Sequence, residues 1–288
     1  MPSLRAIKRQ IASITNTRQI TRAMKMVAAA KFKRAQENLI KIRPYAISTY
    51  DILEDLASRI DITSHPLLTR REVKRVELVI MTSDRGFCGA FNSNIIRFAE
   101  NFIRESSSKY ENITFSCIGR KGRDYFKKRN YQLRREFVKV FDNVNFDIAL
   151  DISNDLIDNF LKSNLDEVIL IYNEFKSVIQ QRVTSLTLLP IIPKPKPEGT
   201  NLIDYIYEPS KEEVLNDLIP RCLAIEVYRA LIESAASEFG ARMTAMENAT
   251  NSASDMIDSL TLKYNRARQA AITKELSEII TGAEAIKK

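Results

Sequence analysis

The sequence offers few side chains for catalysis or metal binding. It contains one histidine, His65, and three cysteines, Cys88, Cys117 and Cys222, in 288 residues. The cysteines are odd in number, far apart and without a CxxC pair, which indicates free thiols in a reducing compartment. Scattered ligands of this kind do not make a zinc site, and one histidine leaves little for a serine or cysteine triad. We therefore expect a non-catalytic chain with no metal and no cofactor.

Long apolar runs are missing as well. No run approaches the roughly 18 apolar residues that a membrane helix needs, so we expect membrane association only through partners. The beginning of the chain, MPSLRAIKRQIASIT, is basic and amphipathic but shows neither an apolar signal segment nor a cleavage site. It continues into a helical pattern, and we predict no targeting peptide there.

Proline is absent from residues 221–281, and Gly240 is the only glycine among these 61 residues. Their apolar or small residues step by three and four, close to the 3.5-residue period of a coiled-coil seam. The seam residues are Met246, Ala249, Ala253, Met256, Leu260, Tyr264, Ala267 and Ala271. At about 1.5 Å per residue this helix would be roughly 90 Å long, too long for the core of such a chain. We predict a shaft or a strut.

Residues 3–60 predict a second long helix with the same period. Its seam residues are Leu4, Ile7, Ile11, Ile14, Thr17, Thr21, Met24, Ala28, Phe32, Ala35, Leu39 and Ile42. Pro44 should kink or interrupt this helix, because a mid-helix proline removes a backbone hydrogen bond. Two seams of matching period at opposite ends of the chain predict an antiparallel coiled coil, with the middle of the chain folded as a compact unit at one end.

The middle of the chain alternates between strand and helix patterns. Strands are expected at 76–82, 113–118, 168–175 and 181–189. Between them lie an amphipathic stretch at 93–104, a helix that follows the turn at 119–122 and runs to about 128, and a helix at 146–162. This alternation is typical of a small, mostly parallel α/β (Rossmann-like) domain. Four prolines within residues 190–197 predict a stiff linker that closes it. The expected division is a coiled-coil helix over 1–60, the α/β domain over 73–195 and the second coiled-coil helix over 206–288.

Glycines after strands raise the possibility of nucleotide binding in the α/β domain. The candidates are the pairs Gly86 with Gly89 and Gly119 with Gly122. Neither pair completes GxGxxG, and no Gly-Lys pair exists for a phosphate-binding loop. Glycine at a strand-to-helix turn more often indicates positive φ or close packing.

Positive charge is concentrated at the beginning of the chain. Residues 1–43 hold eleven Lys or Arg and one acid, whereas the whole chain has a net charge of +8. Such a strip could bind nucleic acid, although aromatic residues and helix-turn-helix spacing are missing there. It could equally bind an acidic protein surface or simply be solvated. The residues alone leave these three interpretations open.

Three groups of residues resemble a known family. They are 11–17 (IASITNT) with 20–31 (ITRAMKMVAAAK), 82–92 (TSDRGFCGAFN) and 264–283 (YNRARQAAITKELSEIITGA). Together they resemble the gamma subunit, the central stalk of the rotary ATP synthase, over nearly the whole chain. The last motif is highly specific, whereas the middle one has Ala90 where the family commonly has glycine and would be weak alone.

The resemblance implies a rotor subunit that couples rotation of a proton-driven c-ring to ATP synthesis or hydrolysis in a ring of alpha and beta subunits. The beta subunits carry the ATP chemistry, and the epsilon subunit and the c-ring contact the α/β domain. No plastid-type regulatory insert with a cysteine pair is present. The resemblance and the missing transit peptide imply a bacterial protein at the cytoplasmic side of the cell membrane, peripheral and without nucleic acid.

Partner-contact residues follow from the same resemblance. Met24 and Lys25 match a part of the first helix that meets an acidic loop of a beta subunit. On the last helix, Arg242, Gln269, Thr273 and Glu275 match positions that face the ring. The foot beside the c-ring is matched by Tyr205, Tyr207 and Glu208. Beyond Ala271, an apolar tip of Ile272, Leu276, Ile279, Ile280 and Ala283 implies a sleeve formed by other subunits.

The competing hypothesis belongs to another class, namely a free basic coiled-coil protein with a nucleotide- or nucleic-acid-binding α/β domain. A stoichiometric ring of partners after purification favours the stalk. Salt-sensitive retention of DNA or RNA favours the alternative.

Overall fold

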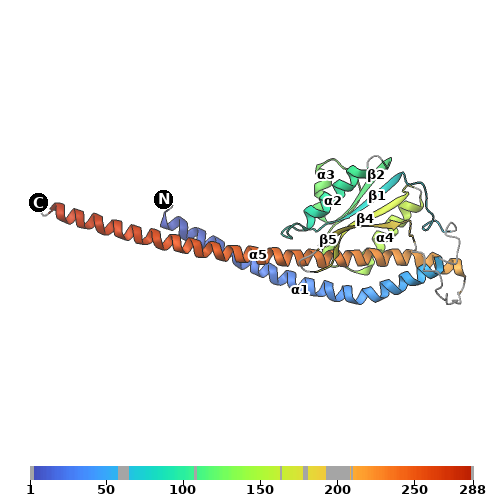
Figure 1. Ribbon diagram of the computed structural model, residues 1–288, viewed down its shortest axis with the longest axis horizontal. Coiled ribbons are helices and arrows are strands. Elements are labelled where there is room, and N and C mark those ends of the chain that lie inside the picture. The colour runs from blue at the N-terminus through green and yellow to red at the C-terminus, as the bar shows by residue number, and fades with distance from the viewer. Residues whose placement is uncertain are drawn as a thin grey trace. The chain divides into compact units, whose positions relative to one another are not determined.

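The computed structural model describes residues 3–57, 65–106, 109–162, 164–177, 181–192, 208 and 210–286. The chain forms two compact units. One consists of Met1–Ala28 with Met243–Lys288, and the other of Ala29–Arg242. Two long helices, α1 (Leu4–Ala57) and α5 (Lys211–Ile286), contribute to both units (Figure 1).

A five-stranded sheet is the centre of the unit Ala29–Arg242. Its strands are β1 (Arg75–Met81), β2 (Asn112–Ile118), β3 (Leu133–Phe137), β4 (Glu167–Phe175) and β5 (Gln181–Leu189). The spatial order is β3-β2-β1-β4-β5, parallel except for β5, which pairs antiparallel with β4 at the edge. Three helices, α2 (Phe91–Ser106), α3 (Arg120–Lys128) and α4 (Phe146–Leu161), connect the strands, with a short 3₁₀ turn at Val140–Asp142. The prediction of a mostly parallel α/β domain is confirmed.

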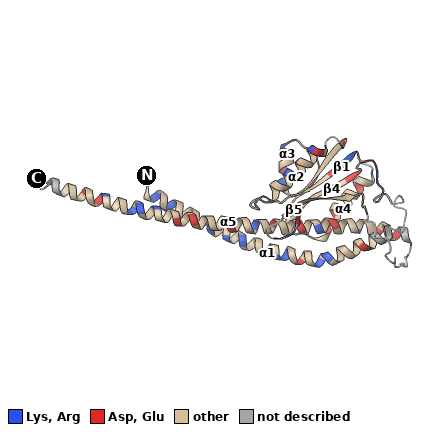
Figure 2. Cartoon of the chain, in the orientation of Figure 1, with Lys and Arg blue, Asp and Glu red and all other residues tan. Residues whose placement is uncertain are grey.

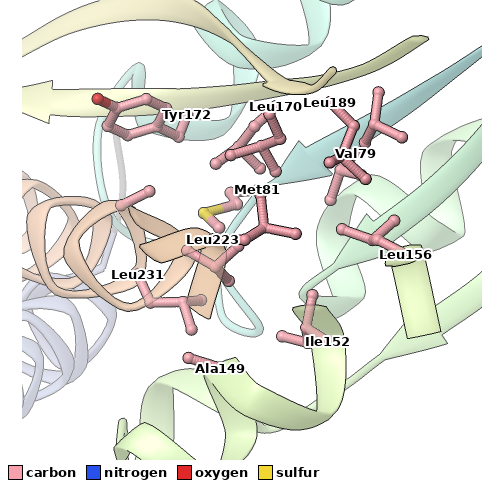
Figure 3. Close-up of a cluster of buried hydrophobic side chains, with 14 of the residues drawn as sticks. Val79, Met81, Ala149, Ile152, Leu156, Leu170, Tyr172, Leu189, Leu223 and Leu231 are labelled. Carbon is pink, nitrogen blue, oxygen red and sulfur yellow. The ribbon is translucent and has the colours of Figure 1, made fainter. Parts of the chain in front are cut away.

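Both faces of this sheet are covered, which explains why its central strands are apolar at nearly every position. Leu78 and Ile80 of β1 pack in one buried cluster with residues of α2 and α3. Val79 and Met81 point to the opposite face, where they join α4 and the part of α5 around Leu223 and Leu231 (Figure 3). The sheet is therefore packed directly on the first half of the chain's longest helix.

The antiparallel pairing of α1 and α5 is visible within each unit. In the unit Met1–Ala28 with Met243–Lys288, Thr250 Oγ1 donates to Thr21 Oγ1 at 2.8 Å and Lys25 Nζ lies 2.6 Å from Glu247 Oε1. In the unit Ala29–Arg242, the thiol of Cys222 lies 3.8 Å from the carbonyl oxygen of Thr49. Partner positions on α5 fall as positions on α1 rise, so the predicted antiparallel coiled coil is confirmed.

Most of the predicted seam residues are buried or half-buried, with two exceptions. Thr17 is exposed, and so is Met256, at 56%. Ile257, next to Met256, is half-buried instead. Met256 and Ile257 lie three and four residues after Ala253, so the helical period alone does not decide which of the two is buried in the seam.

The prolines do not interrupt the long helices. Helix α1 continues through Pro44 to Ala57, and α5 begins at Lys211 and contains Pro220. Of the expected kink or interruption at Pro44, the interruption does not occur. Leu53 beyond Pro44 is fully buried, and packing of this kind offsets the lost hydrogen bond. Strand β3 was missed, because its sequence LRREF is too polar for a strand pattern. The predicted linker at 190–197 lies outside the described residues from 193 onward.

In the unit Met1–Ala28 with Met243–Lys288, α5 extends beyond the beginning of α1 (Figure 1). Every residue from Ile272 to Gly282 is exposed, including Leu276, Ile279 and Ile280. The side chain of Ala283 lies outside the described part. This part of α5 presents an apolar stripe that the described residues of its own unit leave exposed.

Candidate partner-contact site

The first predicted contact residues, Met24 and Lys25, lie on the paired part of α1, and both are half-buried. Lys25 is not a free positive charge, since its Nζ forms a 2.6 Å ion pair with Glu247 of α5. Arg22 beside it is exposed, and Figure 2 shows Lys and Arg recurring along α1. The unpaired charge here therefore comes from Arg22 and its basic neighbours more than from Lys25.

Replacement of Lys25 by alanine should change the free energy of unfolding of the full chain by less than about 1 kcal/mol, because exposed ion pairs contribute little. The packing control is Ala253→Leu, at a buried seam position. Overfilling that position should cost about 1–3 kcal/mol. Urea unfolding followed by circular dichroism measures both. A loss at Lys25 as large as that at Ala253 would contradict the interpretation of this ion pair as a surface contact.

Arg242 faces its own α/β domain. Its side chain is 13% exposed and pairs with Glu238 one turn earlier on α5. The guanidinium also donates to the carbonyl oxygen of Gly86, 3.3 Å away, in the loop after β1. Its carbon lies 6.0 Å from the centre of the Phe239 ring. Both polar contacts use Nη2, and the exposed 13% of the side chain is the part open to contact with another molecule.

Glu238 is a site residue that the sequence analysis missed. It is 2% exposed, and burial raises the pKa of its carboxyl to about 7. The charges of Arg242 and Lys31 lower this pKa, and the charge of Asp84 raises it. The sequence signal that was available is the spacing of four residues from Glu238 to Arg242, which allows a helical ion pair but does not reveal burial.

Helix α5 reaches the place where a nucleotide would bind in a sheet of this type. In open α/β sheets, ligands bind at the carboxyl ends of the strands where the strand order reverses, here beside β1 and β4. The hydroxyl of Ser237 donates to the carbonyl oxygen of Asn173 in β4, and Ser234 Oγ accepts from the backbone N–H of Asn173. Arg242 then contacts the loop after β1. A helix of the chain itself covers this crevice.

The glycine turns have the structural roles that the sequence analysis favoured. Gly119 has φ of +96°, and a Cβ built on it would lie 1.9 Å from the carbonyl oxygen of Thr82. Gly122 donates its backbone N–H to Thr82 Oγ1 at 2.7 Å. Gly89 has φ of +56° with open space around it. A Cβ on Gly122 would lie 2.9 Å from Thr82 Oγ1, so Gly89, Gly119 and Gly122 have conformational or packing reasons for glycine. Gly86 has neither, since a Cβ there would meet only Lys121 Cε at 3.9 Å.

The remaining predicted contact residues are on the surface or outside the described part. Gln269, Thr273 and Glu275 are exposed, and the Thr273 hydroxyl donates to the backbone carbonyl of Gln269 at 3.0 Å. Glu208 is exposed, whereas Tyr205 and Tyr207 lie outside the described residues. Within the unit Met1–Ala28 with Met243–Lys288, Gln269, Thr273 and Glu275 thus lie on exposed helix surface, whereas Met24 and Lys25 lie half-buried on the paired part of α1.

Within the described part of the chain, the reactive groups do not form a catalytic or metal centre. No three metal-ligating side chains converge there. All three cysteines are buried free thiols, as predicted, and burial raises the pKa of Cys117 and Cys222 to about 12. Burial also lowers the pKa of His65. None of the helices over the described residues is long and apolar enough to cross a membrane.

Comparison with known proteins identifies relatives over the full length. A family model described as ATP synthase matches residues 3–286. The ATP synthase gamma chain of Anaeromyxobacter sp. (strain Fw109-5) is 50% identical over 290 residues, with 100% of both chains covered. That of Geobacter metallireducens is 48% identical over 287 residues, again with 100% of both covered.

Solved structures agree with these relatives. A chain of the Tetrahymena thermophila mitochondrial ATP synthase central stalk and c-ring is 29% identical, with a TM-score of 0.61, and the match covers 80% of this chain and 99% of that one. A chain of the Euglena gracilis mitochondrial ATP synthase (OSCP/F1/c-ring) has a TM-score of 0.67, with 98% and 94% covered. At 20% identity, the second likeness concerns the fold alone.

Proposed function

This chain belongs to the ATP synthase gamma-chain family, and from this premise we propose how its structure serves as the central-stalk rotor. The chain is a non-catalytic subunit, and the chemistry of ATP belongs to the beta subunits of the ring of alpha and beta subunits around it. The proposed partners are those two subunits, the epsilon subunit and the c-ring. The family excludes the alternative of a free nucleic-acid-binding protein, and the covered crevice beside β1 and β4 argues independently against a nucleotide site there.

The observation that carries the mechanism is the close antiparallel packing of α1 and α5. The seam is narrow enough for Ala28 and Ala253 to be buried, so the two backbones approach closely. A close-packed pair resists twisting better than one helix does. The pair is also uneven, because residues 1–43 carry eleven basic residues against one acid, whereas residues 220–288 carry nine of each.

Because the two helices differ in charge, rotation of the shaft changes which charge each surrounding subunit contacts. As the shaft turns, each catalytic subunit of a surrounding ring meets first a strongly basic face and then a neutral one. Contact free energy then differs between angular positions, and each site is biased towards a different affinity. This is allosteric coupling by rigid-body rotation.

The contacts with the ring are proposed at three places on the two helices. Met24 and Lys25, with the exposed Arg22, would meet an acidic loop of a beta subunit. Arg242 would present the exposed part of its side chain. Further along α5, the exposed Gln269, Thr273 and Glu275 precede or flank the apolar stripe at the tip. Tyr205, Tyr207 and Glu208 are the proposed foot that meets the c-ring.

Replacement of Arg242 by alanine should lower ATP turnover of the assembled complex by about tenfold, since a hydrogen bond to a charged group contributes about 1.5 kcal/mol. The matched control is Arg221→Ala, which removes an exposed arginine of the same helix that pairs with Asp217. Unchanged turnover in the Arg242 variant, with the complex intact, would remove Arg242 from the coupling contacts.

We also propose the domain division and the location of the protein. The proposed division is a coiled-coil segment over 1–60, an α/β domain over 73–195 and a second coiled-coil segment over 206–288, with the helices of the two segments at Leu4–Ala57 and Lys211–Ile286. The subunit is peripheral, held at the cytoplasmic side of a bacterial cell membrane through its partners.

Affinity purification of a tagged full chain from its own cells tests the proposed function. The expected result is a stoichiometric set of alpha, beta, epsilon and c subunits, with ATP hydrolysis in the assembly and none in the isolated chain. A chain that purifies without such partners, or that hydrolyses ATP alone, would contradict the rotor function. Nucleic acid that co-purifies with the chain and is released from it by salt would support the nucleic-acid-binding hypothesis instead.

A further inference from the structure

The unit Ala29–Arg242 contains a hollow that the rotor function does not use. It lies between the part of α1 around Pro44 and Thr49, the end of β5 and the segment after it, and α5 from Cys222 to Glu233. Its volume is about 710 Å³, within the range of small-molecule sites in proteins. Its lining includes the apolar side chains of Ile47, Leu186 and Leu223.

The hollow has an excess of negative charge. Its described lining holds four carboxylates, Asp51, Glu174, Glu226 and Glu233, against two guanidiniums, Arg43 and Arg229. Arg229 already bonds both acids of its own helix, at 2.7 Å to Glu226 and 3.0 Å to Glu233. Lys176, which does not line the hollow, pairs with Glu174 at 2.6 Å. The acids are therefore only partly neutralised by the chain.

Glu233 supplies the specific acceptor. It is 4% exposed, and Arg229 bonds its Oε1, while its Oε2 is buried without a hydrogen-bond partner among the described residues. Leaving such an oxygen unpaired costs free energy that a hydrogen-bond donor would recover. Burial raises the pKa of this carboxyl, the charge of Glu174 raises it further, and the charges of Arg229 and Arg43 lower it.

The missing donor is better supplied by an organic cation than by a metal ion. A divalent metal needs several converging ligands, and no such group exists in the described part of the chain. A primary ammonium or amidinium needs one carboxylate oxygen and neighbouring negative charge. An alkyl or aryl stem would then cover the apolar side chains of the lining.

We propose that this hollow binds a small organic cation, with an ammonium or amidinium group on Glu233 and an apolar stem against Ile47 and Leu223. The site is separate from the proposed contact residues for the ring. It does not depend on the direction of rotation or on any contact between subunits.

The test uses benzamidine as the cation and benzamide as a neutral molecule of the same shape, titrated into the full chain by calorimetry. Benzamidine should bind at least tenfold more tightly than benzamide. Glu233→Gln, which keeps the shape and removes the charge, should abolish this preference. Glu213→Gln, at an exposed position of α5 that does not line the hollow, should keep it. Equal affinity for both molecules, or an unchanged preference in the Glu233 variant, would overturn the proposal.

A second variant keeps the test valid if the Glu233→Gln protein does not fold. Ile47 is 56% exposed and lines the hollow, so Ile47→Trp should fill the space without touching the buried charges and should block benzamidine. Unimpaired binding in a folded Ile47→Trp protein would place benzamidine elsewhere. The last measurement is benzamidine binding to the assembled complex. Binding retained there supports a small-molecule site in the working rotor. Loss of binding in the complex would mean that a neighbouring subunit covers the hollow, which contradicts such a site.

Discussion

Replacement of Gly119 by alanine should destabilise the full chain by more than about 3 kcal/mol, because strain and a direct clash act together. Gly119 has φ of +96°, where a side chain is strained. Its added Cβ would also lie 1.9 Å from the carbonyl oxygen of Thr82. That oxygen belongs to the backbone at the end of β1 and cannot rotate away. The turn after β2 must therefore open, together with the bond that Gly119 N–H donates to Phe137 O at 2.7 Å.

Two other glycines serve as matched controls. Gly89 also has positive φ, but nothing lies within 4 Å of its added Cβ, so Gly89→Ala should cost only about 1–2 kcal/mol. Gly282 lies in α5 with open space around it, and alanine there should be neutral or stabilise by up to about 1 kcal/mol. Urea unfolding of the three variants gives the ranking. Equal losses at Gly119 and Gly89 would show that the contact with Thr82 does not matter.

Glu238 should make the stability of the chain depend on pH near neutrality. Its carboxyl has a pKa raised to about 7 in the folded protein, against an ordinary value of 4.5. Between these values the folded state binds more protons than the unfolded state, so stability falls as pH rises through this window. A difference of this size corresponds to about 3 kcal/mol, at about 1.4 kcal/mol for each unit of pKa.

Glu238→Gln should remove this dependence, because glutamine keeps the shape without the ionisation. We expect its stability relative to the original chain to rise between pH 5 and pH 8 by up to about 3 kcal/mol. The measurement is the free energy of unfolding in urea at several pH values. Glu247→Gln, which removes a half-exposed carboxylate, should give a curve parallel to that of the original chain. If the curve of the Glu238 variant is also parallel to that of the original chain, Glu238 is not the group that makes stability depend on pH between pH 5 and pH 8.

The same pair bears on the proposed ring contact at Arg242. Arg242 sits between Glu238 and the carbonyl oxygen of Gly86, so a change in the charge of Glu238 alters how firmly the guanidinium is held. Lys31, on α1, also acts on Glu238 and places its ammonium 5.3 Å from the centre of the Phe239 ring. Three elements, α1, α5 and the loop after β1, thus meet around one buried carboxyl.

Periodicity was sufficient for the two long helices, since a seam of 3.5 residues repeated over many turns predicts a coiled coil. Their antiparallel pairing followed from the two matching seams together with a middle segment that folds as a compact unit. Periodicity was also sufficient for the central strands, because β1 and β4 are apolar runs buried on both faces. Strand β3 could not be found in this way. Its Arg134 forms ion pairs with Glu77 of β1 and Asp155 of α4, with Nη2 at 2.8 Å from Glu77 Oε1 and 2.6 Å from Asp155 Oδ2. These partners are distant in the sequence, so a local pattern does not reveal why a polar strand is stable there.

The motifs in the sequence determined the family of this protein, and its helical periods determined a coiled coil joined to an α/β domain. The tertiary structure alone decided that Arg242 turns towards Gly86, that Glu238 is buried beside it and that Glu233 keeps an oxygen without a partner. The physical reason is the range of the interactions. Helical period and turn chemistry act between residues a few positions apart. Burial and charge pairing depend on which distant segments the fold brings together.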